Sequence, residues 1–260
     1  MRIFNLATVT GACLLWATSA SAIVITDTNS AAVLTGAING AGVTISNAVY
    51  SGATSTAAGT FTGGIASGLG FDEGIVLTTG TTACVPGPND QEYCSGAGTT
   101  TSLTFDFEVT SGAGNIFFDY VFGSEEYNEF VGSEFNDSFS LTLDGTTNIA
   151  LVPGGGGVVS INNVNNDSNA GFYVDNSVAG LDLQYDGLTT VLTASATGLA
   201  LGLHSFEFLI QDDGDNAYDS GVFIRAGSFS DEPSLVPEPS IIALFGLGLV
   251  GIGFARRRKA

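Results

Sequence analysis

The stretch Leu103-Thr104-Phe105-Asp106-Phe107-Glu108-Val109 indicates the fold class, because apolar and polar side chains alternate along it. A period of two places the apolar side chains on one face of a β-strand and the polar ones on the other. The alternation recurs in four further segments: 116–122, 139–143, 206–210 and 222–224. Half-buried strands are therefore expected along much of the chain.

Other segments extend this pattern, and the 36 glycines among 260 residues punctuate it with turns. Further strands are predicted at 43–50, 75–79, 148–152, 158–162 and 189–196, one helix at 30–38, and either loop or edge strand at 52–70. Two antiparallel sheets packed face to face bury such strands economically. We therefore expect an all-β fold, a jelly-roll-like antiparallel β-sandwich with acidic outer faces and loops.

The charge balance limits what this chain can bind. Between residues 23 and 236 there are 25 acidic side chains and one cation, Arg225, which gives a net charge of 1 − 25 = −24. Such a surface repels nucleic acid and attracts multivalent cations. The absence of lysine from this segment also excludes Schiff-base chemistry and the phosphate-binding lysine of a P-loop.

Histidine and cysteine are equally scarce. The single histidine, His204, falls within a predicted strand, which favours a packing or surface role and excludes zinc sites built on two histidines. Cys84 and Cys94 are the only cysteines after residue 22. In an oxidising compartment we expect them to form a disulfide, which contributes roughly 3 kcal/mol through the entropy of the short loop that it closes.

Oxygen-bearing side chains gather in three segments between predicted strands. The preferred cation site contains Asp212, Asp213, Asp215 and Asp219, where Gly214 permits a tight turn; a secondary cluster contains Glu125, Glu126, Glu134, Asn136 and Asp137; and a third covers 162–167. Crowded carboxylates repel one another unless they are protonated or bridged by a cation such as Ca²⁺. The alternative interpretation is a set of solvated acidic turns. No other cofactor is expected.

The chain ends favour export. Arg2 precedes an apolar stretch, and Ala20-Ser21-Ala22 is typical of a signal peptidase site, so the mature chain is expected to begin at Ile23. At the other end Pro237-Glu238-Pro239 precedes a 15-residue apolar run and then Arg256-Arg257-Arg258-Lys259. As a helix this run is about 22 Å long, against roughly 30 Å of bilayer hydrocarbon, so it spans a membrane poorly.

This tail closely resembles the PEP-CTERM signal of exopolysaccharide-producing Gram-negative bacteria. The resemblance implies transient anchoring in the inner membrane through the tail, processing by an exosortase, and display at the cell surface or in the extracellular matrix. A generic tail anchor is the alternative.

The mature part resembles the choice-of-anchor L domain. The segment at 122–137, Phe-Gly-Ser-Glu-Glu-Tyr-Asn-Glu-Phe-Val-Gly-Ser-Glu-Phe-Asn-Asp, is similar to that family's signature, as are stretches at 74–80, 148–153, 159–162, 185–193 and 219–224. The resemblance implies a surface domain with no established reaction. The expected organisation is a signal peptide at 1–22, the domain at 23–230, a linker with the PEP motif at 231–239 and a sorting tail at 240–260.

Together these observations favour a non-catalytic binding or structural protein, assisted by Ca²⁺, with exopolysaccharide or neighbouring surface proteins as partners. A purely structural matrix component is a second possibility. A third is a glycoside hydrolase that uses loop carboxylates, such as Glu125 and Glu126, as acid and nucleophile. The enzyme hypothesis requires these carboxylates to face an open cleft.

Overall fold

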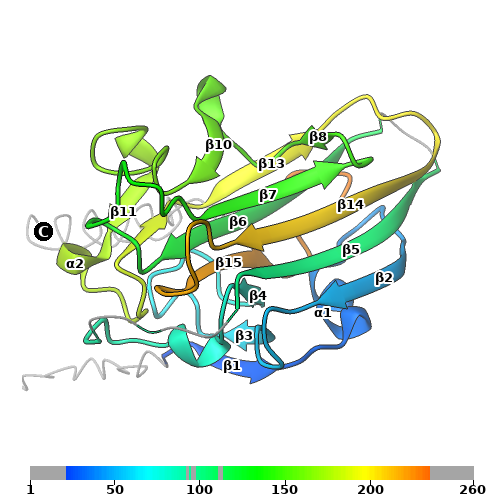
Figure 1. Ribbon diagram of the computed structural model, residues 1–260. Coiled ribbons are helices and arrows are strands. Elements are labelled where there is room, and N and C mark those ends of the chain that lie inside the picture. Colours follow the sequence, from blue (N-terminus) through cyan, green and yellow to red (C-terminus); the bar gives the residue numbers. More distant parts are fainter. Residues whose placement is uncertain (1–21, 92–93, 95–97, 111–113, 235–260) are drawn as a thin grey trace, which may run out of the picture.

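The computed structural model describes residues 22–91, 94, 98–110 and 114–234. It shows two antiparallel sheets packed against each other (Figure 1). The first sheet contains β1 (Val24–Asp27), β3 (Ala58–Thr62), β4 (Gly74–Thr78), β15 (Ser220–Arg225), β6 (Ile116–Ser124), β12 (Gly187–Thr189) and β11 (Tyr173–Asp175) in that order, with β13 (Leu192–Ala196) also paired to β6. The predicted all-β sandwich is confirmed.

The second sheet contains β2 (Ile45–Ser51), β5 (Thr100–Val109), β14 (Gly202–Gln211), β7 (Ser138–Leu143), β10 (Gly157–Ser160) and β9 (Leu151–Val152), with β8 (Thr147–Asn148) paired to β7. The alternating stretch at 103–109 lies in β5, which pairs with β14 along ten residues of each strand. Two α-helices, α1 (Ala31–Ile38) and α2 (Asn176–Ala179), and three short 3₁₀ helices, η1 (Thr82–Cys84), η2 (Pro153–Gly155) and η3 (Ala170–Phe172), complete the described elements.

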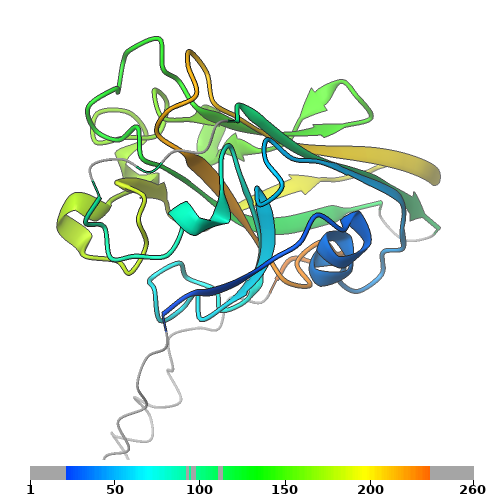
Figure 2. The ribbon, with the colours of Figure 1, turned by 60° about the horizontal axis from the view of Figure 1, so that its bottom comes forward.

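The main core lies between the two sheets, and α1 closes one side of it, as the second view shows (Figure 2). Phenylalanine and tyrosine rings fill this space; the rings of Phe107 and Phe206, for example, stack with centroids 4.9 Å apart. Large aromatic side chains contribute much of the apolar surface that folding removes from water. The alternation in β5 and β14 therefore supplies one wall of the core.

The first sheet buries its outer face as well. In β15 the side chains of Val222 and Ile224 join the main core, whereas Phe223 joins a second apolar cluster with Phe61, Val121 and other residues. The expectation of acidic outer faces is therefore wrong for this sheet, because segments from 63 to 72 and from 181 to 185 cover it. The outer face of β5, with Asp106 and Glu108, does carry acidic side chains.

Arg225 lies at the end of β15. Its guanidinium donates to Oδ2 of Asp119 at 3.1 Å, and the Thr193 hydroxyl donates to Oδ1 of the same carboxylate at 2.7 Å. Asp119 is 3% exposed, so this pair neutralises a buried charge. The only arginine or lysine among the described residues is thus committed to Asp119.

Candidate functional site

The acidic segments meet at one end of the sandwich, at the left of Figure 1, where two chain crossings run side by side. The first crossing leads from β6 to β7, and the second leads from β14 to β15. Ser124 at the end of β6 pairs with Ser220 at the start of β15, while Ser138 of β7 pairs with Gln211 of β14. This register places the residues just beyond those strand ends next to one another.

Five acidic side chains at this end are buried, and we call them and their two half-buried or exposed neighbours the carboxylate end. The buried members are Glu125, Glu126, Asp137, Asp212 and Asp219; the other two are Asp213 and Asp215. In the sequence these residues fall into two separate clusters, the preferred cation site and the secondary cluster, but the fold brings them together. Solvated acidic turns do not describe the buried members.

Asp137 ties the two crossings together. Its Oδ1 accepts a hydrogen bond from the backbone N–H of Asp213 at 2.9 Å, and its Oδ2 accepts one from the Ser220 hydroxyl at 2.6 Å. Burial raises the pKa of Asp137 to about 7, although these two hydrogen bonds oppose the shift. Asp137 therefore holds the 212–219 loop against the start of β7.

Glu126 and Asp212 are buried without complete hydrogen bonding. Oε2 of Glu126 and Oδ1 of Asp212 have no partner. Burial, reinforced by the other carboxylates, raises the pKa of each to about 8. Buried polar atoms in folded proteins are normally paired, so unpaired carboxylate oxygens that face other acids indicate a place for protons or for a cation.

Gly214 shapes the loop that carries these groups, as the sequence predicted. Its φ of +107° is a conformation that side chains rarely adopt, and a Cβ there would lie 2.7 Å from Cδ1 of Phe135. The 212–219 loop therefore packs directly on the 125–137 crossing. Glycine is required both for the backbone conformation and for the close approach.

Other predicted site residues are not among the buried acids of the carboxylate end. Glu134 is exposed, and the Asn136 side chain instead accepts a hydrogen bond from the backbone N–H of Asn162 at 3.0 Å. In the 162–167 segment, Asn165 is buried and its Oδ1 accepts from the backbone N–H groups of Asp167 and Ser168. These asparagines therefore stabilise loops.

The predicted disulfide joins Cys84 and Cys94, whose Cα atoms are 5.5 Å apart. Cys94 lies beside the carboxylate end, because its carbonyl accepts from the backbone N–H of Asp219 at 3.1 Å. The backbone N–H of Thr81 donates to Oδ2 of Asp219 at 3.0 Å. Sequence reasoning predicted the disulfide but not its contact with the acidic residues.

Asp186 is an acidic neighbour of Glu125 that was not predicted from the sequence. It immediately precedes β12, whose first residue, Gly187, pairs with Ser124, and it adds to the repulsion that raises the pKa of Glu125. No pattern around residue 186 marks it as part of a site. Only the pairing of β12 with β6 brings it there.

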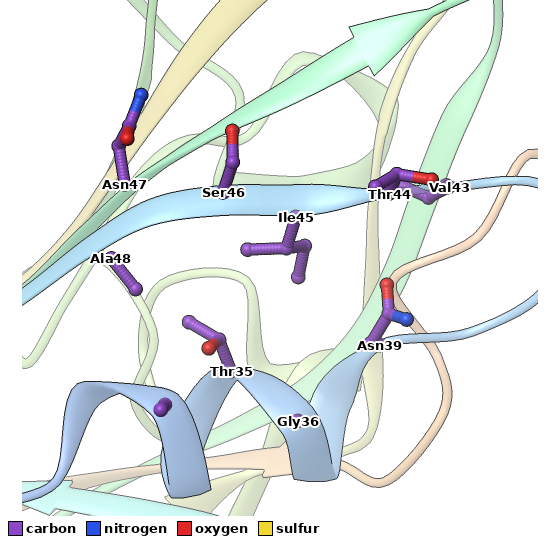
Figure 3. Close-up of a pocket in the computed structure, with 10 residues that line it drawn as sticks. Thr35, Gly36, Asn39, Val43, Thr44, Ile45, Ser46, Asn47 and Ala48 are labelled. Atoms are coloured by element: carbon purple, nitrogen blue, oxygen red, sulfur yellow. The ribbon is translucent and has the colours of Figure 1, made fainter.

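The main surface hollows lie elsewhere. A groove of about 450 Å³ separates α1 from β2, and Thr35, Ile45 and Ala48 point into it (Figure 3), but none of its lining residues is ionisable. A cavity of about 620 Å³ includes the exposed carboxylates Glu108, Asp231 and Glu232. Glu125 and Glu126 line neither of these hollows and are each 1% exposed, so they do not face the open cleft that a glycosidase needs.

The described part of the chain contains neither a ready-made metal centre nor a membrane-spanning helix. Among the residues that the structure describes, no three or more His, Cys, Asp or Glu side chains are arranged so that they could hold a metal ion. The same part of the chain contains no helix long and apolar enough to cross a membrane. Apart from Ala22, the predicted signal peptide lies outside the described residues, as do the PEP motif and the sorting tail.

The fold and the carboxylate end define an acidic β-sandwich domain with buried, mutually repelling carboxylates at one end. A family model for the choice-of-anchor L domain matches residues 24–230, and the chain belongs to that family. A second model, for the PEP-CTERM protein-sorting motif, matches residues 235–259. No curated protein and no solved structure matches the chain.

These matches confirm both resemblances. The sorting motif implies export through an exosortase-type system of Gram-negative bacteria, and the choice-of-anchor domain implies a surface protein. Both families are of the anchoring or sorting type rather than enzyme families. The matches identify neither a ligand nor an ion.

Proposed function

We propose that this protein is a non-catalytic component of the cell surface or extracellular matrix that binds Ca²⁺ at its carboxylate end. Signal peptidase and an exosortase remove its two ends, after transient anchoring in the inner membrane. Exopolysaccharide or neighbouring surface proteins are its partners.

One observation carries the calcium proposal: Glu126 and Asp212 each bury a carboxylate oxygen without a hydrogen-bond partner, beside Asp137 and Asp215. Arg225, the only arginine or lysine in the described part, is engaged at the opposite end of β15, roughly 17 Å along the strand. Where these acids are not protonated, the cation that balances them therefore comes from solution.

Ca²⁺ fits this chemistry better than other biological cations. It is a hard ion that accepts six to eight oxygen ligands in irregular geometry, including carboxylates, carbonyls and water. Mg²⁺ needs a near-octahedral shell, and zinc prefers the nitrogen and sulfur ligands that are scarce here. We propose that Glu126 and Asp212 rotate onto the ion, with Asp213, Asp215 or water completing the shell.

Calcium-dependent stability tests the proposal. The exported protein is melted in chelator and in increasing Ca²⁺, together with the Glu126→Gln, Asp212→Asn and Glu134→Gln variants. Free Ca²⁺ at a hundred times Kd contributes about 2.7 kcal/mol, or roughly 5–10 °C in Tm. The wild type and the exposed Glu134→Gln control should show this shift, and the other two should lose it. A wild-type Tm unchanged by Ca²⁺ contradicts the proposal.

The partner is tested with the same proteins. We expect extracellular polysaccharide to co-sediment with the wild type in Ca²⁺ and less so in chelator or with Glu126→Gln. Release of reducing ends that disappears in the Glu125→Gln and Glu126→Gln variants would instead support the glycoside hydrolase.

A further inference from the structure

The only histidine of the chain, His204, lies near the start of β14, at the opposite end of the sandwich from the carboxylate end (right-hand side of Figure 1). Its ring stacks on Phe107 with centroids 5.5 Å apart, and its side chain is 12% exposed. Phe206, two residues further along the strand, belongs to the main core. The alternation of β14 therefore places the imidazole at the margin of that core.

Both ring nitrogens of His204 face an oxygen. Nδ1 lies 2.8 Å from Oδ2 of Asp144, and Nε2 lies 2.9 Å from the carbonyl oxygen of Ala200. A neutral imidazole has one N–H and one bare nitrogen, so it can donate to only one of these two acceptors. The doubly protonated ring donates to both, and the arrangement therefore favours the charged form.

The two acceptors come from segments that are distant in sequence. Asp144 lies in the turn between β7 and β8, and Ala200 lies in the connection 197–201, which leads from β13 in the first sheet to β14 in the second. The backbone N–H of Ser205 donates to Oδ1 of Asp144 at 3.0 Å, so β14 also orients this carboxylate. We call His204, Asp144 and Ala200 the histidine clasp.

Among the described residues, Asp144 is the one charged group that faces the ring. On β5, Asp106 and Glu108 flank Phe107 and so point to the outer face of the sheet. Glu207 of β14 points to that face for the same reason. The connection 197–201, β2 and β8 contain no charged residue, and the main core is built from uncharged side chains.

The clasp lies at the end of the sandwich from which the linker leaves. Strand β13 ends at Ala196, which pairs with Ile116 of β6, and the connection 197–201 follows directly. The next residue of β6, Phe117, exchanges two backbone hydrogen bonds with Ser230, at 2.9 and 3.2 Å. The connection that His204 holds therefore starts beside the strand that fixes the beginning of the linker.

We propose that the histidine clasp is a pH-sensitive device, which ties the β7–β8 turn to the 197–201 connection while the ring carries two protons and releases one of them when a proton is lost. After that loss a bare nitrogen faces an oxygen, and the hydrogen bond on that side is replaced by repulsion. The device involves neither the carboxylate end nor its ion.

The pH window of the clasp follows from its two titrating groups. Burial disfavours the charged ring, but the Ala200 carbonyl and Asp144 outweigh it and raise the pKa of His204 above its ordinary value of 6.5. The contribution to stability is therefore complete below 6.5 and is lost as pH rises through the folded-state pKa. Burial also acts to raise the pKa of Asp144, but hydrogen bonds from His204 and Ser205 lower it below 3.8, so the clasp stays closed in mild acid.

Nuclear magnetic resonance of the untagged exported protein tests the charge state, because a single histidine gives unambiguous ring signals. We expect both ring nitrogens to be protonated at pH 6.5 and the titration midpoint to lie above that value. Asp144→Asn should move the midpoint to lower pH. Glu108→Gln is the matched control, since it removes one negative charge from the outer face of the neighbouring strand, and it should leave the midpoint nearly unchanged.

Amide hydrogen exchange tests the release, with rates corrected for the intrinsic effect of pH. The protection of the Leu199 and Ser205 amides should fall between pH 6 and pH 9 by about tenfold more than that of Phe223 in β15, as expected for one charge-assisted hydrogen bond. The fall should be absent in His204→Gln. If that variant does not fold, Asp144→Asn takes its place, because it removes the acceptor of the same bond.

Each of three results overturns the proposal. A wild-type midpoint at or below 6.5 means that the ring is not held in its charged form. Equal shifts in Asp144→Asn and Glu108→Gln mean that the overall negative charge, rather than the clasp, acts on the ring. Protection at Leu199 and Ser205 that follows Phe223 at every pH means that deprotonation releases neither segment.

Discussion

Glu125 and Glu126 have different surroundings because successive side chains of an extended backbone point to opposite faces. Phe122, four residues before Glu126, faces the main core, and Gly123, two residues before Glu125, faces the outer cluster through Tyr185. Each glutamate continues the face of its predecessors beyond the end of β6. Glu125 and Glu126 thus have different acidic neighbours, although Asp219 acts on both Glu125 and Asp212 and so links the two sets.

Gly214 provides a prediction at the residue scale. A Gly214→Ala substitution adds a Cβ at φ +107° and 2.7 Å from the Phe135 ring. We expect a loss of about 2 kcal/mol in chelator from backbone strain and the clash, and weaker Ca²⁺ binding because the loop moves. Denaturant melts in chelator and in Ca²⁺ measure both effects.

The matched control for Gly214 is Gly202→Ala, at φ +126° with open space around the new Cβ. It isolates the cost of the backbone conformation from that of the contact with Phe135. Equal losses in the two variants, with unchanged calcium affinity in Gly214→Ala, would show that the loop packing does not shape the site.

Arg225 provides a second prediction at this scale. Asp119 is 3% exposed. An Arg225→Met substitution removes one of the two side chains that donate to its carboxylate and leaves the Thr193 hydroxyl. We expect the free energy of unfolding to fall by about 2 kcal/mol, less than for a fully buried pair because the arginine side chain is 28% exposed. Urea titration measures the loss.

Restoration by Asp119→Asn in the Arg225→Met background is the control, since the amide removes the uncompensated charge. Calcium affinity should be unchanged in both variants, because the pair lies at the other end of β15 from the carboxylate end. A calcium affinity that follows Arg225 would mean that the ion pair and the site are coupled.

The acidic residues of the site could be predicted from the sequence, but which of them lie together in the fold could not. Local crowding identified Asp212 and Glu125, because acids in loops without lysine are conspicuous. Whether such acids are solvated or buried depends on partners that are distant in sequence. Asp186, alone between Tyr185 and Gly187, shows this most clearly, since only β-sheet register brings it to Glu125.

At the scale of elements, strands with a strict alternation were predicted well, and short or edge strands were not. The pattern at 103–109 falls within β5, and helix α1 begins and ends within a residue of the predicted 30–38. The segment 52–70 contains β3, and β1 was not predicted, because a four-residue strand such as Val-Ile-Thr-Asp has too few positions to establish a period.

Strand β4 shows why the apolar outer face of the first sheet could not be predicted from the sequence. All five of its residues, Gly74–Thr78, are buried, so no polar face marks its orientation. A strand covered on both sides reads as an unbroken apolar run, which leaves the second covering layer undetected in sequence. This is why the outer apolar cluster was mistaken for an acidic face.

The disulfide-closed loop provides a prediction at the element scale. Removing the Cys84–Cys94 bond should destabilise the protein by about 3 kcal/mol through the entropy of the unfolded chain alone. If Cys94, whose carbonyl accepts from the backbone N–H of Asp219, also supports the calcium site proposed at the carboxylate end, the loss should be larger in Ca²⁺ than in chelator, because binding adds to the stability of the folded form. Thermal melts of wild type and Cys84→Ser/Cys94→Ser in both conditions give the difference.

Thr54→Ala serves as a control that weakens a nearby loop without touching the disulfide, since its hydroxyl donates to the carbonyl of Gly80 at 2.6 Å. Its destabilisation should be the same with and without Ca²⁺. An identical loss for the cysteine variant in both conditions would separate the loop from the cation.

On the scale of the whole molecule, the sandwich concentrates its repulsion at one end. Two chain crossings, a strand terminus and a disulfide-closed loop all converge on the carboxylate end. Surplus negative charge elsewhere is screened by water, but these groups are buried and must take up protons or cations. If the proposed calcium binding is correct, the ion is a structural component of the exported domain.

The pH dependence of stability tests this view of the whole molecule. Burial and mutual repulsion raise the pKa of Glu125 to about 9 and of Glu126 and Asp212 to about 8, whereas in the unfolded chain these groups ionise at their ordinary values of 4.5 and 3.8. Between pH 5 and 8 the folded state therefore retains protons that the unfolded state has released. Stability in chelator must fall as pH rises through this window.

We expect Tm in chelator to be higher at pH 5 than at pH 8, by roughly 5 °C for about 2 kcal/mol, and saturating Ca²⁺ to remove most of that difference because it replaces the protons. His204 contributes in the same direction, since Asp144 and the carbonyl of Ala200 raise its pKa. The measurement is therefore repeated with His204→Gln. A slope that disappears in this variant would assign the effect to His204, whereas a slope that persists and is abolished by Ca²⁺ assigns it to the buried carboxylates.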